Sequence, residues 1–185
     1  MTLKDMLGKK RIIVFFIFVG LFSASYQIGS VSQVTDEESE QFLDEFQSLI
    51  EGIDALEIFT HNVTIALPMF IPGFGIAWGF FTGWTTGFGF AAIINSIPAL
   101  SNIPALAVLY VSPFGILELV AYSLAISRSY LFMFAIIKKI SIRPQFLPLI
   151  IEVGIVIVLL LVGGLLESAM IQNVSASAID NLSLS

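Results

Sequence analysis

The sequence has 185 residues, of which 57% are hydrophobic and 12% charged, and its mean hydropathy is +0.95. A soluble domain of this length needs more polar surface, so the composition excludes an ordinary soluble protein and indicates one integral-membrane domain with short tails. The net charge of −6 belongs to one segment, because nine of the fourteen acids fall between Asp36 and Glu57, where there is no Lys or Arg.

Several kinds of site are excluded by residue counts. The sequence has no cysteine, which excludes disulfides and thiolate metal sites. Its single histidine, His61, leaves no imidazole-rich metal centre, and we expect neither a metal nor a cofactor. No phosphate-binding loop, hydrolase motif or basic stripe is present, so we expect no nucleic-acid partner.

The N-terminal segment pairs a basic flank with an apolar run. Residues 1–11 carry four of the eight Lys and Arg residues, and residues 12–29 form the apolar run. By the positive-inside rule this predicts a cytoplasmic N-terminus followed by a first spanning helix. The small residues at 23–25 leave a cleaved signal peptide as the alternative, although the apolar character continues past that point.

Residues 30–57 are predicted to form an external, acidic, amphipathic helix. Thr35 and Glu38 have the spacing of a capping box. Beyond them, apolar residues recur every three or four positions, namely Phe42, Phe46, Leu49, Ile53 and Leu56. An interfacial membrane helix normally carries cations, and this one carries none, so we expect residues 36–57 to pack on their own bundle or on a membrane or extracytoplasmic protein partner.

The core membrane region covers residues 58–137 and ends at the cationic loop 138–145, which we expect inside. A segment that begins outside and ends inside crosses an odd number of times, and its length allows three helices. We expect them at about 60–81, 86–109 and 113–137. Asn and Pro residues interrupt the middle one, so it is either continuous or broken.

A final apolar run at 146–166 is predicted to cross outward, which leaves the tail 167–185 outside. The fold class is therefore all-α: a polytopic bundle of about five transmembrane helices in the cell membrane, N-terminus in and C-terminus out, embedded in the lipid bilayer. Asn173 and Asn181 each begin a glycosylation sequon that this topology would expose.

Glycines at intervals of four indicate a helix-packing seam. They are Gly75, Gly79, Gly83 and Gly87. Positions four apart share a helix face, where glycine lets another backbone approach closely. The seam fits either a partner helix in the same chain or a homo-oligomer. A turn is expected within the TGWTTG stretch, which would place Gly83 and Gly87 on another helix.

Ionisable and amide groups inside the apolar segments form two predicted clusters. On the expected topology, His61, Asn62 and Glu118 share the outer third of the membrane, and Arg128 and Glu152 share the inner third. Each cluster has either a structural role, as buried polar partners, or a functional one. In the functional case, Glu118 is the candidate ligand for a proton or cation.

An Asn that opens a helix at HNVTIAL, an expected glycine-rich hairpin and then a P-x-G-x-x-E element occur in that order. The element is formed by Pro113, Gly115 and Glu118. In this combination, over about residues 58–137, the chain resembles the stage II sporulation protein M family of integral membrane proteins. The resemblance implies that Asn62, Gly115 and Glu118 are shared positions and that the protein is a membrane scaffold for other proteins. Phe114 stands where family members usually have His, which removes an imidazole beside Glu118 unless His61 takes its place.

These observations favour a non-enzymatic scaffold or assembly factor. The alternative is a small transporter or channel-like protein with a polar path through Glu118 and Arg128. An intramembrane enzyme is the weakest of the three hypotheses, because the acids are isolated and there is no cysteine.

Overall fold

The computed structural model describes residues 8–50 and 54–183, and within residues 48–50 and 173–183 it describes the backbone alone. Among these residues all regular structure is helical, which confirms the all-α fold class. The α-helices are, in chain order, α2 (Lys9–Ser30), α3 (Asp36–Ile50), α4 (Ala55–Ala66), α5 (Phe74–Ser96), α6 (Ala105–Val111), α7 (Pro113–Ile137) and α8 (Phe146–Ser183). Short 3-10 turns lie at Leu67–Phe70 (η1), Pro98–Leu100 and Arg143–Gln145.

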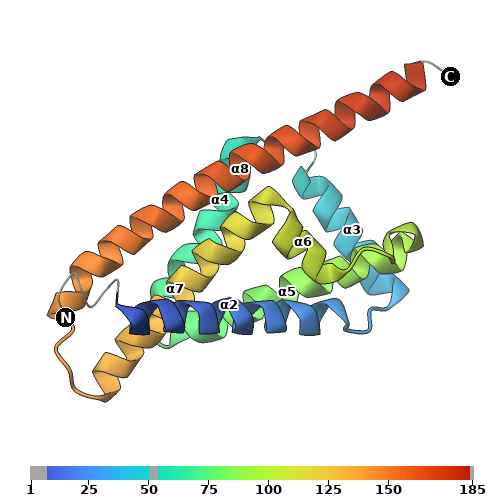
Figure 1. Cartoon of the computed structure of the whole chain (residues 1–185). Helices are drawn as coiled ribbons and strands as arrows, with labels where there is room; N and C mark the ends of the chain where they lie inside the picture. The colour runs from blue at the N-terminus through green and yellow to red at the C-terminus, as the bar shows by residue number, and fades with distance from the viewer. Residues whose placement is uncertain (1–7, 51–53, 184–185) are drawn as a thin grey trace.

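The helices are arranged around α7, with α2 and α5 side by side and α8 crossing the bundle diagonally (Figure 1). Phe18 of α2 stacks on Phe80 of α5, and Gly87 lies against Tyr26, so these two helices run parallel. By contrast α7 and α8 are antiparallel, because Arg128 contacts Glu152 whereas Gly163 faces Leu117.

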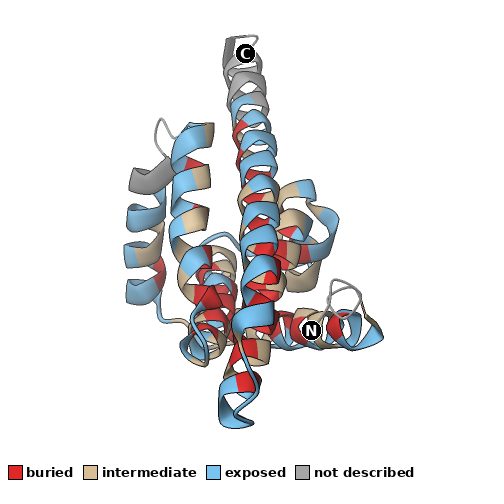
Figure 2. Cartoon of the chain, turned by 90° about the vertical axis from the view of Figure 1, so that its left-hand side faces the viewer, coloured by how far each residue is buried: buried red, intermediate tan, exposed pale blue. Residues whose placement is uncertain are grey.

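Three helices are long and apolar enough to cross a membrane, by length and composition, within the part of the chain that is described. They are Lys9–Ser30, Pro113–Ile137 and Arg143–Gln172. The α7 span is 56% buried inside the protein, against 28% for each of the other two, so it is the central helix. The outward sides of the helices remain exposed (Figure 2) and carry large apolar side chains such as Phe16 and Ile150, as expected for a surface that faces lipid.

Inside residues 58–137 the helix expected at 113–137 is confirmed as α7, whereas the boundaries of the other two expected helices differ. Instead of a helix over 60–81, α4 and η1 end at Phe70, and the chain turns at Pro72 and Gly73 before α5 begins. Gly73 has a φ of +78°, which glycine adopts without strain. The hydroxyl of Ser129 fixes this turn by accepting from the Gly73 NH at 3.1 Å and donating to the Ile71 carbonyl at 2.6 Å.

The expected turn at TGWTTG is absent, since α5 runs unbroken through it. The hydroxyls of Thr82, Thr85 and Thr86 donate to carbonyls of the preceding helical turn, at 2.9–3.0 Å, which removes the need for outside partners. Of the two alternatives left open for residues 86–109, the broken one is confirmed: α5 ends at Ser96, and Pro98 and Pro104 prevent its continuation. The last helix is longer than the expected 146–166, because α8 continues through most of the 167–185 tail.

The segment between α2 and α4 forms a shorter helix than residues 36–57. The capping box is confirmed: the Thr35 NH donates to Glu38 Oε2 at 2.9 Å, and the Glu38 NH donates to Thr35 Oγ1 at 3.2 Å. Helix α3 ends at Ile50, and a second capping box, Asp54 with Glu57, begins α4. Residues 51–53, with Ile53 of the expected stripe, lie outside the described residues.

Candidate functional site

The start of α7 explains the P-x-G-x-x-E element residue by residue. Pro113 occupies the first helical turn, where its fixed φ suits the helix and its missing NH costs nothing. The Ser112 hydroxyl caps this turn by accepting from the Gly115 NH at 3.1 Å. A side chain at Gly115 would meet Ser112 Oγ at 2.5 Å and the Val108 carbonyl at 2.7 Å, so glycine permits the close approach of α6.

One turn further, Glu118 lies in a polar cluster between α4 and α7. Asn62 Nδ2 donates to Glu118 Oε1 at 2.8 Å, and the Tyr122 hydroxyl donates to Asn62 Oδ1 at 3.2 Å. Asn62 and Tyr122 are buried, and Glu118 is half-buried. Of the three residues expected here, the structure brings Asn62 and Glu118 together, whereas the His61 side chain is exposed. His61 therefore does not supply the imidazole that is missing beside Glu118, where Phe114 stands in place of the family's usual His.

A second carboxylate, Glu167 of α8, lies close enough to Glu118 for their charges to repel. No ion pair of Glu118 is present among the described residues. Tyr122 and Glu167 were not singled out from the sequence. The antiparallel pairing of α7 and α8 gives only its approximate level: with Arg128 beside Glu152, the ten residues back to Glu118 correspond to about position 162 of α8, and Glu167 lies five residues further along.

The other expected pair, Arg128 and Glu152, is a bidentate ion pair. Arg128 Nε donates to Glu152 Oε2 at 2.7 Å, and Nη2 donates to Oε1 at 2.5 Å. The Arg128 side chain is completely buried, and that of Glu152 is 9% exposed. Both charges are thus removed from lipid, which is the arrangement that permits charged groups within apolar helices.

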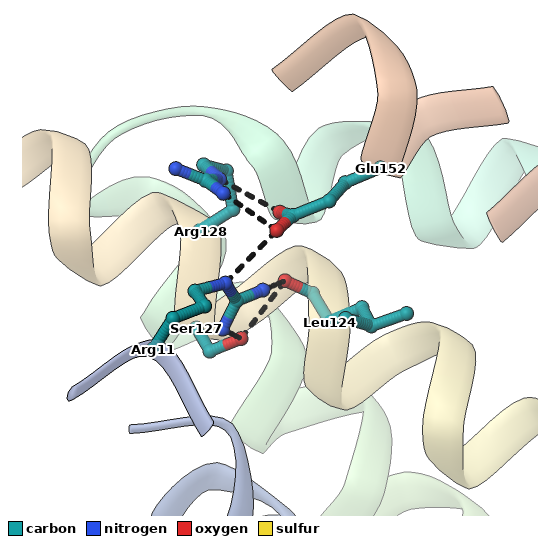
Figure 3. Close-up of polar contacts among 5 residues, drawn as sticks. All are labelled: Arg11, Leu124, Ser127, Arg128 and Glu152. Carbon is teal, nitrogen blue, oxygen red and sulfur yellow. Dashed lines mark hydrogen bonds and ion pairs between the residues drawn. The ribbon is translucent and has the colours of Figure 1, made fainter. Parts of the chain in front are cut away.

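A third member of this cluster, Arg11, comes from α2. Arg11 Nε donates to Glu152 Oε1 at 2.9 Å, and Nη1 donates to the Ser127 hydroxyl at 2.9 Å. Figure 3 shows the two guanidiniums converging on the one carboxylate. In the sequence Arg11 belongs to the basic flank, and it differs from Lys9 and Lys10 in being an arginine and the last cation before the apolar run.

The cluster of Arg11, Arg128 and Glu152 has two cations for one anion. Arg128 Nη1 is buried and has no hydrogen-bond partner among the described residues. The guanidinium nitrogens that do bond tie α2, α7 and α8 together at one level. The cluster therefore joins α7 and α8 to α2, since Arg11 is 116 positions from Ser127 and 141 from Glu152.

The four expected seam glycines lie on one continuous face of α5 and are all buried. Gly87 lies against the Tyr26 carbonyl and Gly83 against Phe22, both on α2. Gly79 faces Ile126 of α7, and Gly75 lies against the backbone of Met69. All contacts of these four glycines that the structure describes are therefore with other parts of the same chain. Gly29 of α2, which was not singled out, makes the reciprocal approach to the backbone of Trp84.

No group of three or more potential metal ligands occurs among the residues that the structure describes. The side chains of Asn173 and Asn181 lie outside the described residues, so the sequons stay sequence-based predictions. Hydrogen bonds and ion pairs between side chains thus hold carboxylate, amide and guanidinium groups inside an apolar bundle.

Comparison with known proteins matches the chain to one family. Neither a curated protein nor a solved structure matches it. The family model of stage II sporulation protein M matches residues 11–170, which include Asn62, the glycine seam, the P-x-G-x-x-E element and the Arg128–Glu152 pair. With apolar helices long enough to cross a bilayer, this is a membrane protein, and the chain belongs to the stage II sporulation protein M family.

Proposed function

We propose that this protein is a non-enzymatic scaffold of the cell membrane, which holds a membrane or extracytoplasmic partner through residues 36–57. The observation that carries the proposal is the placement of α3. Its Phe42 ring packs where Gly89 of α5 leaves space, and the Ser39 hydroxyl is bonded to Asn95 of α5 at 3.0 Å. A short acidic helix is thus fixed on the end of the bundle, with its charged side exposed.

The polar groups of the bundle support the same proposal. Asn62, Tyr122, Arg11 and Arg128 use hydrogen bonds to join helices. Because these polar groups bond to one another, they hold the helices in a fixed arrangement, as a scaffold for other proteins requires.

We further propose five crossings, with α2, α4 plus η1, α5, α7 and α8 each passing once. The pairings support alternating directions: α2 and α5 run parallel, and α7 and α8 antiparallel. Asn62 lies beside Glu118 and Ile71 beside Ser129, so α4 with η1 runs in the direction of α7. The cations Lys9, Lys138 and Lys139 would then all lie inside.

The topology is tested by single cysteines, since the natural chain has none. A cysteine between Ser32 and Thr35, or in the tail after Ser168, should react with an impermeant maleimide added to intact cells. A cysteine at Ser141 should react only after the cells are opened. Protection of the tail in intact cells would contradict five crossings.

The scaffold is tested by comparing capture with flux. The full chain and a variant with Asn or Gln at every acid of Asp36–Glu45 are used to capture cross-linked partners from native membranes. In parallel, the full chain and Glu118→Gln are reconstituted into liposomes for ion and solute flux. A scaffold should lose partners when α3 is neutralised and show no flux above empty liposomes. Flux that Glu118→Gln abolishes, with unchanged capture, would contradict the proposal.

A further inference from the structure

An open hollow of about 590 Å³ lies where α2, α3 and α5 meet. Its walls are the connection 30–35 between α2 and α3, and Ala91, Ile94 and Asn95 at the end of α5. Most of its lining is apolar, with Val31 and Val34 on one wall and Ala91 and Ile94 on the other. The hollow is at the opposite end of α2 from Arg11, which places it on the outer side in the proposed topology.

The rim of this hollow is acidic. Asp36 Oδ1 accepts from Asn95 Nδ2 at 3.2 Å, and Glu38 Oε2 accepts from the Thr35 hydroxyl at 2.8 Å, so both carboxylates contact residues of the walls. Both side chains are exposed. No Lys or Arg occurs from residue 12 to residue 127 or after Arg143, so the chain supplies no such cation to neutralise this rim.

We infer that the hollow is a docking site for a peptide segment of an extracytoplasmic protein, in which Lys or Arg residues flank an apolar side chain. The apolar side chain would fill the space between Val34 and Ile94, and the cations would meet Asp36 and Glu38 at the rim. Opposite charges across a rim steer association and select the partner. This inference rests on the proposed scaffold function and names the chemistry of its partner.

Charge complementarity separates this occupant from two others. A second copy of the chain, inserted in the same direction, carries its exposed cations at the other end of the bundle, and Arg11 and Arg128 are buried in their own cluster. An anionic lipid headgroup would be repelled by Asp36 and Glu38. A basic, partly apolar peptide is complementary both to the apolar walls and to the acidic rim.

The inference is tested by photo-crosslinking in the native membrane. The photoreactive residue benzoylphenylalanine replaces Gln33, which lines the hollow and is exposed, in the full chain. The same residue at Phe16, on the exposed side of α2, reports background adducts. After digestion, mass spectrometry identifies what is attached. We expect peptides of an extracytoplasmic protein with Lys or Arg within a few residues of the attachment point.

Two matched variants test the role of the rim. Asp36→Asn with Glu38→Gln keeps hydrogen-bond acceptors and should lower the adduct yield at Gln33 about five-fold, because two charge pairs are lost. Asp44→Asn with Glu57→Gln removes the same net charge away from the hollow and should change the yield less than about two-fold. The identified peptide, resynthesised with Gln in place of its cations, should lose binding to the purified protein.

Several outcomes would overturn the inference: adducts with lipid or a second copy alone, no protein adduct, attached peptides without cations, or equal losses in the two variants. Attached peptides without cations would leave the scaffold proposal standing, because a partner would still be held at α3. Failure of the scaffold itself would appear in the capture experiment as binding that is indifferent to α3.

Discussion

Arg11 Nε donates a hydrogen bond of 2.9 Å to Glu152 Oε1, joining residues that are 141 positions apart in the chain. The same carboxylate accepts from Arg128, so one anion serves two buried guanidiniums. Removing the anion is therefore a larger change than removing either cation. Loss of Glu152 leaves two buried positive charges uncompensated, whereas loss of Arg11 leaves a neutral pair.

Glu152→Gln should lower the free energy of unfolding by about 3–5 kcal/mol, as expected when a buried ion pair loses one member. Arg11→Met should cost less, about 1–2 kcal/mol, because its hydrogen bonds are lost but Arg128 and Glu152 stay paired. The measurement is reversible unfolding in mixed micelles followed by circular dichroism. The test is that Glu152→Gln loses more stability than Arg11→Met, as expected if one carboxylate serves both guanidiniums.

A charge-free control completes this test. Replacing Arg11, Arg128 and Glu152 together by Met removes all three charges while keeping much of the volume. Since apolar replacement of a buried ionic cluster is often neutral, the triple variant should be more stable than Glu152→Gln. A triple variant that is less stable than Glu152→Gln would contradict this account of the cluster.

The polar cluster around Asn62 predicts opposite outcomes for two adjacent residues. Asn62→Ala leaves Glu118 without its amide donor and Tyr122 without its acceptor, and should cost about 1–3 kcal/mol. His61→Ala changes an exposed side chain and should stay within about 0.5 kcal/mol of the natural protein. The same unfolding assay measures both. Equal losses would mean that His61 is part of the cluster after all.

Two glycines should respond oppositely to alanine. A methyl group at Gly87 would overlap the Tyr26 carbonyl and push α5 away from α2, at a cost of about 1–3 kcal/mol. At Gly154 nothing lies within 4 Å, so Gly154→Ala should be neutral or stabilising by about 0.5–1 kcal/mol through helix propensity. Helix content and unfolding midpoint of the two variants check this, and a destabilised Gly154→Ala would show that this face is covered.

Periodicity and charge predicted the all-helical class, and the depth argument paired Arg128 with Glu152. These succeeded because spacing within one helix and distance from a membrane end follow directly from the sequence. The limits of α7 also followed, but those of α5 did not, because glycine and threonine favour turns in water. In α5 the threonine hydroxyls instead bond back to the helix, and α2 packs closely against the glycines. Arg11 was missed because its partner is on the last helix, and no local signal marks a contact across 141 residues.

The capping box at the start of α3 predicts the titration of Glu38. Hydrogen bonds from the Thr35 backbone NH and hydroxyl lower the pKa of Glu38 below the ordinary value for glutamate. A lowered folded-state pKa means that its stabilising contribution is present above the unfolded pKa and is lost as the pH falls through the folded pKa. NMR of the labelled carboxyl should show the low pKa. Thr35→Ala should raise it part of the way, because the backbone bond remains, and an unchanged pKa would contradict the side-chain contribution.

The packing of α2 predicts that residues 12–29 remain in the mature protein. Cleavage at 23–25 would detach Arg11 from Glu152 and remove Phe18 and Phe22, which are 5% and 2% exposed, from the core. It would also remove the Phe22 backbone and ring against which Gly83 of α5 packs. Intact-mass measurement of the protein from its native membrane should therefore include these residues. As a control, Ala24→Leu removes a small residue required by a signal peptidase and should leave the mass otherwise unchanged. A mature mass that begins near Ser25, and is lengthened by Ala24→Leu, would instead identify a signal peptide and would require another partner for Glu152.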